Sequence, residues 1–483
     1  MAPPTSITFF NFMISTYLIL SQISVTFMKG HALERSLAAE SNYHTVHVSS
    51  ILPSSACKPS AKGPSRKSSL KVVHRHGPCH QLNQESSNRE TLTQILSEDQ
   101  TRVKSIQARH AFRADTDKIR GSKADLPAKS GIAIGTGNYV VSVGLGTPAK
   151  SYTLAFDTGS DLTWTQCEPC VGFCHKQEDP IYDPVKSSSY SNISCNAAQC
   201  SALSSATGKP PGCSASNCLY LIQYGDLSFS VGFFAKERLT LTPTDVFDEF
   251  FFGCGQNNQG IFGQTSGLLG LGRDPLSIVS QTARKYGKYF SYCLPTKSGS
   301  NGHLTFGKGS VPNTVKFAPF SSSSSQSNSF YFLDIQSISV GGQLLSISAS
   351  VFLTARNVVD SGTVITRLPP AAYSALRSAF RQQMSQYKTA PAASILDTCY
   401  DFSSQSTVKI PKISIIFSGN VKVDLAIEGT LLLPSSLSQV CLAFAGNSAA
   451  TDMGIYGNTQ QQTFDVVYDV AGGKLGFAPG GCS

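Results

Sequence analysis

The sequence is poor in charged side chains and nearly free of tryptophan. Asp, Glu, Lys and Arg make up 14% of the 483 residues, and there is one Trp. An average soluble domain has about 25% charged residues, so the composition favours many short strands and turns over long solvated helices. Hydrophobic residues reach 41%, which excludes general disorder. At roughly 100–200 residues per domain, the length predicts two or more domains or one large two-lobed unit.

The positive charge of the chain is concentrated near its N-terminus. Residues 1–130 carry 17 Lys and Arg against 9 Asp and Glu, whereas residues 131–483 carry 22 against 21. Binding to nucleic acid depends on clustered positive charge. The near-neutral charge of residues 131–483 therefore argues against a nucleic-acid partner. A DNA-associated role would rest on residues 1–130 alone.

Residues 7–28 form an apolar run without a charged residue. An apolar core followed by small residues near 30–32 predicts a signal peptide over residues 1–32, although the usual basic residue before the core is missing. A stable membrane anchor is not expected, because polar residues such as Asn11 and Gln22 interrupt the run of about 20 apolar residues that an anchor needs. We expect a secreted protein; a plastid transit peptide is the alternative.

Residues 33–130 form a basic segment that differs from the rest of the chain. Between residues 90 and 113, apolar residues recur at helical spacing among charges, which predicts one helix. The Gly-rich stretch at 131–137 marks a boundary, so we expect a detachable segment. The apolar residues of the predicted helix are Leu92, Ile95, Leu96, Val103 and Ile106.

From residue 138 onward the sequence predicts a β protein. Runs of β-branched and aromatic residues alternate with Gly, Pro, Asn and Ser, and the best helical pattern is at 370–387. The Ser-rich run at 321–329 indicates a loop between two halves. We predict lobes at 131–319 and 320–483.

One four-residue motif occurs twice, each time at the end of a β run. Positions 157–160 read Asp-Thr-Gly-Ser, and positions 360–363 read Asp-Ser-Gly-Thr. A second apolar, Gly-containing stretch follows each copy, at 268–272 and 455–458. A single copy is commonly just a turn. Two copies in matched contexts indicate a duplicated lobe that supplies one Asp each.

Asp157 and Asp360 are therefore the predicted catalytic pair. Two carboxylates about 3 Å apart cannot both ionise, so they share one proton. One carboxylate can then act as a base on water while the protonated one donates to a substrate carbonyl. Hydrolysis of a peptide bond needs both roles.

The remaining motif residues are expected to support this pair. Gly159 and Gly362 let the backbone approach closely and offer amide donors to the carboxylates. Two hydroxyl side chains can bond across to the opposite loop, and two others can hold the outer carboxylate oxygens. These hydroxyl residues are, respectively, Thr158 with Ser361 and Ser160 with Thr363.

With these motifs, residues 130–483 resemble the pepsin-type aspartic proteases, and within them the plant nepenthesin-like group. Residues 156–164 are similar to the first active-site motif of that family, 359–363 to the second, and 70–79 to a prosegment signature. The resemblance implies an all-β, bilobal fold of two related β lobes with the active site in the cleft between them. It also implies a monomeric endopeptidase that cleaves proteins or peptides at acidic pH, needs no cofactor and is made as a zymogen. Similarity to plant chloroplast nucleoid DNA-binding proteases keeps a chloroplast location open, beside the apoplast and the vacuole.

The resemblance also assigns roles to two aromatic residues. Tyr224 lies where the family has its flap tyrosine, and Trp164 matches the residue that hydrogen-bonds that tyrosine. Without the resemblance, Tyr224 is an ordinary strand aromatic and Trp164 a core residue. We expect both to border the substrate, together with the Gly and outer hydroxyl residues of the two motifs.

The cysteine pattern predicts disulfides. Twelve of the 14 cysteines lie in residues 131–483, an even number that suits a secreted body. The spacing of Cys167, Cys170 and Cys174 beside His175 would also suit zinc, but we predict disulfides and no metal. Connectivity stays open, and Cys293–Cys482 and Cys399–Cys441 are the pairs that we expect. The other cysteines of the body are Cys195, Cys200, Cys213, Cys218 and Cys254.

Three further expectations concern modification, regulation and function. Asn192 begins an N-glycosylation acceptor, which implies an exposed position. Near neutral pH, an Arg or Lys of the segment 33–130, with Lys71 and Arg75 as candidates, is expected to pair with the two Asp residues and cover the cleft until acid releases it. A binding or inhibitor protein on the same fold is the alternative function, and the two intact Asp motifs favour the protease.

Overall fold

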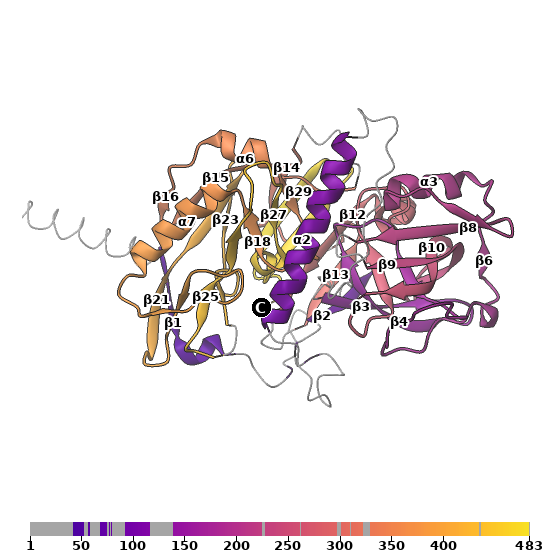
Figure 1. The fold of residues 1–483 in the computed structure, drawn as a ribbon, viewed down its shortest axis with the longest axis horizontal. Helices are drawn as coiled ribbons and strands as arrows, with labels where there is room; N and C mark the ends of the chain where they lie inside the picture. The colour runs from indigo at the N-terminus through magenta and orange to yellow at the C-terminus, as the bar shows by residue number, and fades with distance from the viewer. Residues whose placement is uncertain are drawn as a thin grey trace, which may run out of the picture.

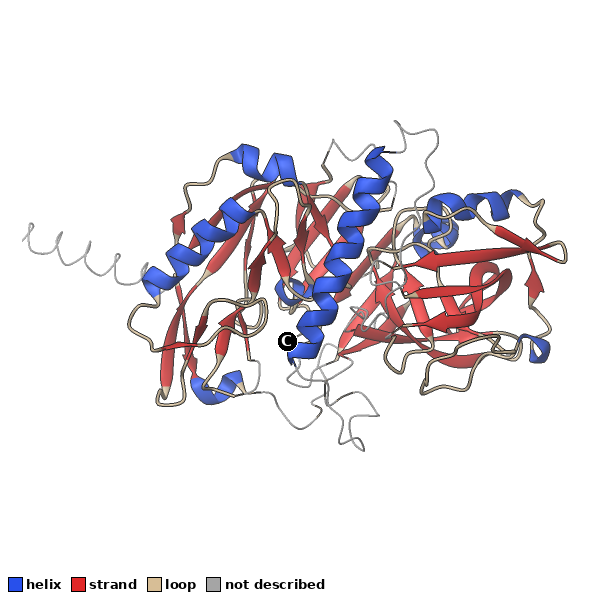
Figure 2. Cartoon of the chain, in the orientation of Figure 1, coloured by secondary structure: helices blue, strands red, loops and turns tan. Residues whose placement is uncertain are grey.

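The computed structural model describes residues 42–52, 57, 68–74, 77, 79, 92–115, 139–224, 228–260, 262–296, 301–309, 311–321, 329–433 and 436–482, with backbone alone at 92 and 108–115. Two β-rich lobes flank one long helix, α2 (Leu92–Asp115) (Figures 1 and 2). The predicted all-β, bilobal architecture is confirmed. The predicted signal peptide lies outside the described residues. Within them, no helix has the length and hydropathy needed to cross a membrane.

The largest sheet has 15 strands and runs from the second lobe through the centre of the molecule into the first lobe. In order across the sheet, its strands are β14 (Lys316–Pro319), β29 (Lys474–Pro479), β28 (Phe464–Asp469), β12 (Tyr289–Cys293), β13 (Gly302–Phe306), β2 (Ser69–His74), β3 (Tyr139–Leu145), β4 (Lys150–Asp157), β11 (Gly267–Gly270), β5 (Trp164–Gln166), β10 (Asp245–Gln259), β9 (Phe229–Thr242), β8 (Asn217–Gln223) and β7 (Gly212–Ser214), with β6 (Ser191–Asn192) paired to β9.

The second lobe is built mainly from smaller sheets. One four-stranded sheet has the order β16 (Gln343–Leu344), β15 (Ile335–Val340), β22 (Ile413–Phe417), β23 (Val421–Asp424); a second has β17 (Asn357–Val359), β27 (Gly454–Tyr456), β18 (Thr366–Leu368), β26 (Phe444–Gly446); a third has β19 (Thr389–Ala390), β20 (Cys399–Tyr400), β25 (Val440–Leu442), β24 (Leu431–Leu432); and β1 (Tyr43–His47) pairs with β21 (Thr407–Pro411).

Among the described residues, the helices other than α2 and α7 are short. Helix α7 starts at a proline, as suits the first turn, and buries Tyr373, Leu376 and Phe380 on one face. It confirms the helical pattern expected at 370–387, although it ends at Gln383. The helices are α3 (Ala198–Thr207), α4 (Ile278–Gln281), α5 (Ala283–Tyr286), α6 (Ala349–Ala355) and α7 (Pro370–Gln383), with 3-10 turns η1 (Val48–Ile51), η3 (Pro184–Lys186) and η5 (Asn458–Gln461).

Two strands of the basic segment belong to the body's sheets. Strand β2 lies between β13 and β3 and is hydrogen-bonded to both, and β1 extends the edge of the second lobe at β21. We had expected this segment to lie outside the core. Its alternating pattern explains the difference, because Leu70 and Val72 of β2 point into the main hydrophobic core.

Candidate active site

The two Asp motifs occupy equivalent positions in the two lobes. Asp157 ends β4, which runs parallel to β11, and Asp360 directly follows β17, which runs parallel to β27. The backbone of Leu271 donates to the carbonyl of Asp157 over 2.8 Å, and the backbone of Asp360 donates to the carbonyl of Tyr456 over 3.1 Å. Each Asp is therefore fixed by the apolar, Gly-containing stretch that follows its own motif.

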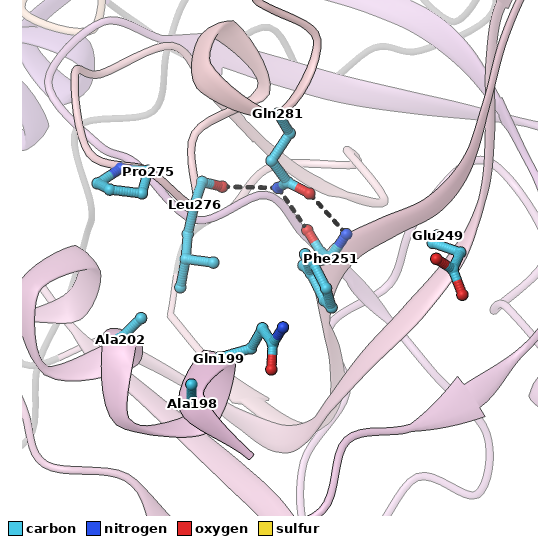
Figure 3. A pocket seen from close by; sticks show the side chains of 8 residues that line it. All are labelled: Ala198, Gln199, Ala202, Glu249, Phe251, Pro275, Leu276 and Gln281. Carbon is cyan, nitrogen blue, oxygen red and sulfur yellow. Dashed lines mark hydrogen bonds between the residues drawn. The ribbon is translucent and has the colours of Figure 1, made fainter. Parts of the chain in front are cut away.

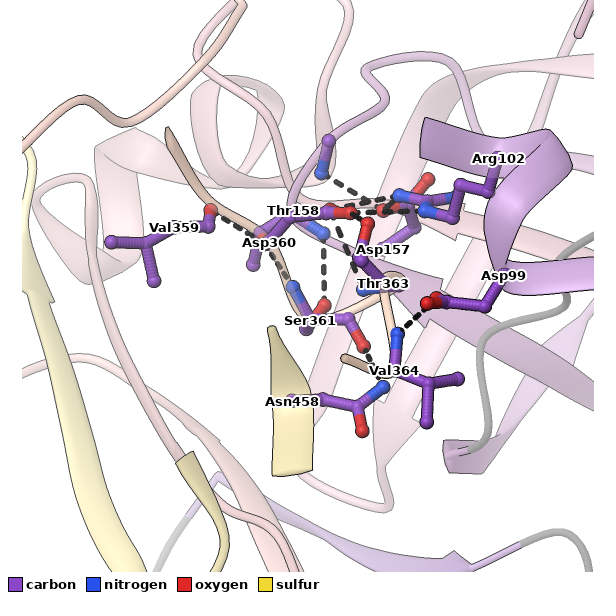
Figure 4. Close-up of polar contacts among 12 residues, drawn as sticks. Asp99, Arg102, Asp157, Thr158, Val359, Asp360, Ser361, Thr363, Val364 and Asn458 are labelled. Carbon is purple, nitrogen blue, oxygen red and sulfur yellow. Dashed lines mark hydrogen bonds and ion pairs between the residues drawn. The ribbon is translucent and has the colours of Figure 1, made fainter. Parts of the chain in front are cut away.

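The hydroxyl groups of Thr158 and Ser361 lock the two loops together. The Ser361 amide donates to Thr158 Oγ1 over 2.9 Å, and the Thr158 amide donates to Ser361 Oγ over 3.1 Å. Thr158 Oγ1 also donates across to the Val359 carbonyl over 3.4 Å. Within the second lobe, the side-chain amide of Asn458 donates to the Ser361 carbonyl over 2.9 Å (Figure 4). These bonds match the crossing pattern expected from the sequence.

A third charged residue, Arg102 of α2, contacts both carboxylates (Figure 4). Its Nη2 lies 2.5 Å from Asp157 Oδ1 and 2.8 Å from Asp360 Oδ1, and its Nε donates to Asp360 Oδ2 over 2.9 Å. The side chains of Arg102, Asp157 and Asp360 are 6%, 1% and 0% exposed. One buried guanidinium thus bridges the lobes at their paired motifs.

The charges of this cluster shift one another's proton affinity. Burial raises the pKa of Asp157, but the adjacent Arg102 outweighs burial and holds that pKa below its ordinary value. Burial likewise lowers the pKa of Arg102, while Asp157 and Asp360 raise it more strongly. The arrangement therefore favours an ionised Asp157 beside a permanent cation.

Gly159 and Gly362 leave the room that the guanidinium occupies. A Cβ at Gly159 would lie 2.6 Å from Asp360 Oδ1, and a Cβ at Gly362 would overlap the Arg102 guanidinium. Both glycine amides also donate to the carboxylates, over 2.9 Å from Gly159 to Asp157 Oδ1 and over 3.4 Å from Gly362 to Asp360 Oδ1. The expected close approach and amide donors are both present.

The two outer hydroxyl groups behave differently. Thr363 Oγ1 donates to Asp360 Oδ2 over 2.5 Å, as expected. Among the described residues, Ser160 Oγ and Asp157 Oδ2 each lack a hydrogen-bond partner, although both are buried. Ser160 still contributes to the lowered pKa of Asp157, as its expected role beside this carboxylate requires. Asp157 Oδ1 is held by Arg102 and Gly159.

One turn before Arg102, Asp99 forms a second buried contact with the second lobe. It accepts hydrogen bonds from the backbone amides of Val364 and, over 3.2 Å, Ile365. Its Oδ2 also lies 2.8 Å from Nη2 of Arg367, and the two side chains are 0% and 1% exposed. Asp99 thus anchors α2 just beyond the second motif.

The rest of α2 packs on the same lobe. Gln107 exchanges two hydrogen bonds with the backbone of Met453, at 2.7 and 2.6 Å. Ile95 and Leu96 join an apolar cluster with Val364 and Ile365, and Val103 and Ile106 join one with Phe330, Phe332, Val358, Met453 and Ile455. Apolar contacts therefore hold the helix on both sides of its charged residues Asp99 and Arg102.

The sequence analysis missed Arg102. The expectation for Lys71 is wrong, because Lys71 is exposed in β2, where it pairs with His303 of β13; Arg75 lies outside the described residues. A signal was present, since Asp99 and Arg102 fall at helical spacing between Ile95 and Ile106 on the apolar face of the predicted helix.

Trp164 and Tyr224 meet at the end of the β8–β9 hairpin. Trp164 Nε1 donates to Tyr224 Oη over 3.0 Å, and Phe262 packs edge-on against both rings. Both residues are buried, at 0% and 7% exposure. The adjacent residues 225–227 at the tip lie outside the described part, so the flap role of Tyr224 stays a prediction.

All 14 cysteines are paired in seven disulfides. The two pairs expected from the sequence are formed, and among the described residues no three His, Cys, Asp or Glu side chains are grouped to hold a metal. Cys57–Cys79 lies within the basic segment, and no disulfide joins this segment to the body. The body pairs are Cys167–Cys254, Cys170–Cys174, Cys195–Cys213, Cys200–Cys218, Cys293–Cys482 and Cys399–Cys441.

Two surface features lie apart from the Asp pair. Asn192 is exposed on β6, as its acceptor motif requires. A groove of about 450 Å³ on the first lobe is lined by α3 and by Phe251, Leu276 and Gln281 (Figure 3). Gln281 donates to the carbonyls of Leu276 and Phe251 over 2.8 and 2.9 Å, so its polar groups serve the fold. The groove contains none of the motif residues.

Comparison with known proteins agrees with this geometry. Two family descriptions match the chain, Xylanase inhibitor N-terminal at residues 139–308 and Xylanase inhibitor C-terminal at 330–479. The chain is similar to an aspartyl protease family protein of Arabidopsis thaliana, with 55% identity over 92% of this chain and 94% of the relative. It is also similar to aspartic proteinase nepenthesin-2 of Nepenthes gracilis, with 38% identity over 77% and 85%. The crystal structure of edgp shares the fold, with a TM-score of 0.57, 19% identity, and coverage of 71% of this chain and 91% of that chain.

Proposed function

The chain belongs to the pepsin-type aspartic proteases of plants and is an aspartic-type endopeptidase; on that premise we propose that Asp157 and Asp360 are its catalytic pair and that the structure is its inhibited zymogen. Residues 33–130 are the inhibitory prosegment of this proposal, and 131–319 and 320–483 are its catalytic lobes. Protein or peptide chains are the substrates.

One observation carries the proposal. The guanidinium of Arg102 occupies the space between the two carboxylates, where a catalytic water and a substrate carbonyl would have to lie. A cation at this place lowers the pKa of Asp157 and so opposes sharing of a proton between the two carboxylates, which hydrolysis needs. The docked helix therefore blocks the chemistry by charge as well as by volume.

Release of α2 would restore the catalytic state. Without Arg102, two close carboxylates share a proton, so one can take a proton from water while the other donates to the substrate carbonyl. The ties between Thr158 and Ser361 hold both side chains in place. Tyr224, braced by Trp164, would close over the substrate and exclude bulk water.

The covalent structure permits this release. Because no disulfide joins Cys57 or Cys79 to the body, one backbone cut between 116 and 138 would leave the segment held by non-covalent contacts alone. We place the cut near residues 120–135, where Gly and Ala are frequent in the sequence. The seven disulfides also favour an oxidising compartment, and we propose entry into the secretory pathway and glycosylation at Asn192.

The decisive test is acid proteolysis by the full chain. We expect hydrolysis of a denatured protein substrate at acidic pH that pepstatin inhibits. The variants Asp157→Asn and Asp360→Asn should fold but lose activity by roughly three orders of magnitude or more, because an amide cannot exchange the shared proton. Near-wild-type turnover by either folded variant would remove that residue from the catalytic pair.

A binding protein of the same fold is the second candidate, favoured by the description of the matching family. The intact pair of Asp motifs supports the protease instead. The same assay separates the two, since a binding protein would show no pepstatin-sensitive hydrolysis at any pH after the segment is removed.

A further inference from the structure

Arg367 is a buried cation of the body whose carboxylate partner comes from the basic segment. It lies in the middle of β18, and its side chain is 1% exposed. Its Nη1 donates to the carbonyl of Ile365 over 3.1 Å, and its Nη2 contacts Asp99 Oδ2 over 2.8 Å and Gln100 Oε1 over 3.4 Å. Within the described residues, Nε has no partner and Asp99 supplies the one carboxylate.

Three donors of the body converge on the Asp99 carboxylate. Two are the backbone amides of Val364 and Ile365, and the third is the Arg367 guanidinium. All three come from residues 364–367, which directly follow the second Asp motif. They form a compact site for one carboxylate that the body itself leaves open.

The departure of α2 would leave these donors without their acceptor. A buried charge that loses its partner is strongly unfavourable, and two backbone amides would lose their hydrogen bonds at the same time. The mature enzyme would therefore present an unsatisfied, positively charged site beside its catalytic pair.

We propose that this site, formed by Arg367 and the amides of Val364 and Ile365, selects an acidic side chain of the substrate close to the scissile bond. The proposal rests on the proposed function. Asp99 and Arg102 are three residues apart, so they differ by about 4.5 Å along the helix axis. An extended substrate advances about 3.3 Å per residue, which places the acidic side chain one or two residues from the bond that is cut. Asp99 imitates this side chain while Arg102 covers the catalytic pair.

Paired peptides test the preference directly. The full chain is activated by acid and assayed at about pH 5, where a Glu side chain is largely ionised. Peptides with Glu are compared with otherwise identical peptides with Gln at each position near the scissile bond. We expect kcat/KM to be about tenfold or more higher for Glu at one position, the size of a charge-assisted hydrogen bond.

Substitution of the cation shows where the preference arises. Arg367→Gln should bring the Glu-to-Gln ratio close to one, and Arg367→Lys should keep part of it. The ratio compares two substrates of one sample, so it does not depend on the fraction of enzyme that folds. Arg238→Gln is the matched control, because Arg238 forms an exposed ion pair with Asp248 in the other lobe and should leave the ratio unchanged.

The outcomes separate the two proposals. Equal cleavage of all Glu and Gln pairs by the wild type overturns the acidic site and leaves the protease in place, with Arg367 serving only to anchor the segment. A preference that survives in Arg367→Gln also overturns the assignment. If Arg367 variants do not fold, the wild-type ratios alone decide, and absence of cleavage of every peptide overturns both proposals.

Discussion

At the scale of single residues, Arg102 contacts both members of the proposed catalytic pair, Asp157 and Asp360. It is the one described side chain that contacts both carboxylates, and it is almost fully buried. Removing one partner from a buried ion cluster costs about 3–5 kcal/mol. Loss of Arg102 would therefore destabilise the docked state of α2. The released state would be affected less, because there the two carboxylates can share a proton.

We therefore expect Arg102→Gln to weaken inhibition. A loss of about 3–5 kcal/mol shifts the docking equilibrium by more than about a hundredfold. The full chain should then hydrolyse substrate at a higher pH than the wild type, before any cut in the chain. Lys104→Gln is the matched control, because Lys104 is exposed on the same helix. An Arg102→Gln protein as inactive as wild type at every pH would show that Arg102 is not the inhibitory group.

The same residues show what the sequence could and could not predict. The pairing of Asp157 with Asp360 in space could be predicted, because the same short local motif occurs twice. Arg102 was not identified, because its role depends on where a helix of the segment docks, and that docking rests on apolar contacts with Phe330, Val358 and Ile455.

At the scale of elements, α2 is a helix whose stability depends on its docking surface. Its apolar residues contact the second lobe on both sides of the Asp99–Arg102 centre. Among its anchors, Ile106 is fully buried against the second lobe. An amphipathic helix of this kind gains most of its stability from packing of its apolar face.

Ile106→Ala should therefore loosen α2 without touching the charge cluster. The loss of a buried Ile side chain costs about 2–5 kcal/mol, and part of this cost will appear as easier local opening. Amide hydrogen exchange of residues 92–107 should be faster by more than about tenfold in the full chain near neutral pH. Ser97→Ala, at an exposed position of the same helix, is the control. Unchanged exchange in Ile106→Ala would mean that the helix does not rely on this contact.

Strand β2 is the element of the basic segment that the sequence analysis did not predict. The helix of this segment was predicted from its spacing, whereas β2 was not, although its residues 69–74 alternate in burial. A strand of six residues carries little local signal, and its pairing with β13 and β3 is decided by chain segments far away in sequence.

At the scale of the whole molecule, the proposed zymogen predicts that pH links docking of the basic segment to activity. The pKa of Asp157 is lowered in the docked state, so the docked state binds fewer protons at this carboxyl than the released state. Docking is therefore favoured above the ordinary carboxyl pKa values of about 4 and is lost as the pH falls through the lowered value. Asp99 has the opposite effect on the pH dependence of docking. Burial raises its pKa despite the neighbouring Arg367, so the docked state binds more protons at Asp99 than the released state does. Acid therefore releases the segment only if protonation of the Asp pair weakens docking more than protonation of Asp99 strengthens it.

We expect activity and size to change together when the full chain is taken from neutral pH to about pH 4. Activity should rise as the N-terminal mass is lost by a cut between 116 and 138. Mass spectrometry and a peptide assay on the same samples follow both changes. Full activity at neutral pH, or activity at pH 4 without loss of mass, would show that residues 33–130 do not restrain the enzyme.

The position of β2 in the middle of the large sheet has a consequence for the mature enzyme's lifetime. If the cut segment leaves, β3 and β13 lose the strand that joined them, together with the buried Leu70 and Val72. The processed body then lacks a segment that was present when the full chain folded. Once unfolded, it would lack the strand that joined β3 to β13. Its working life would be set by the height of its unfolding barrier, so that a brief exposure to denaturing conditions becomes an irreversible switch to inactivity.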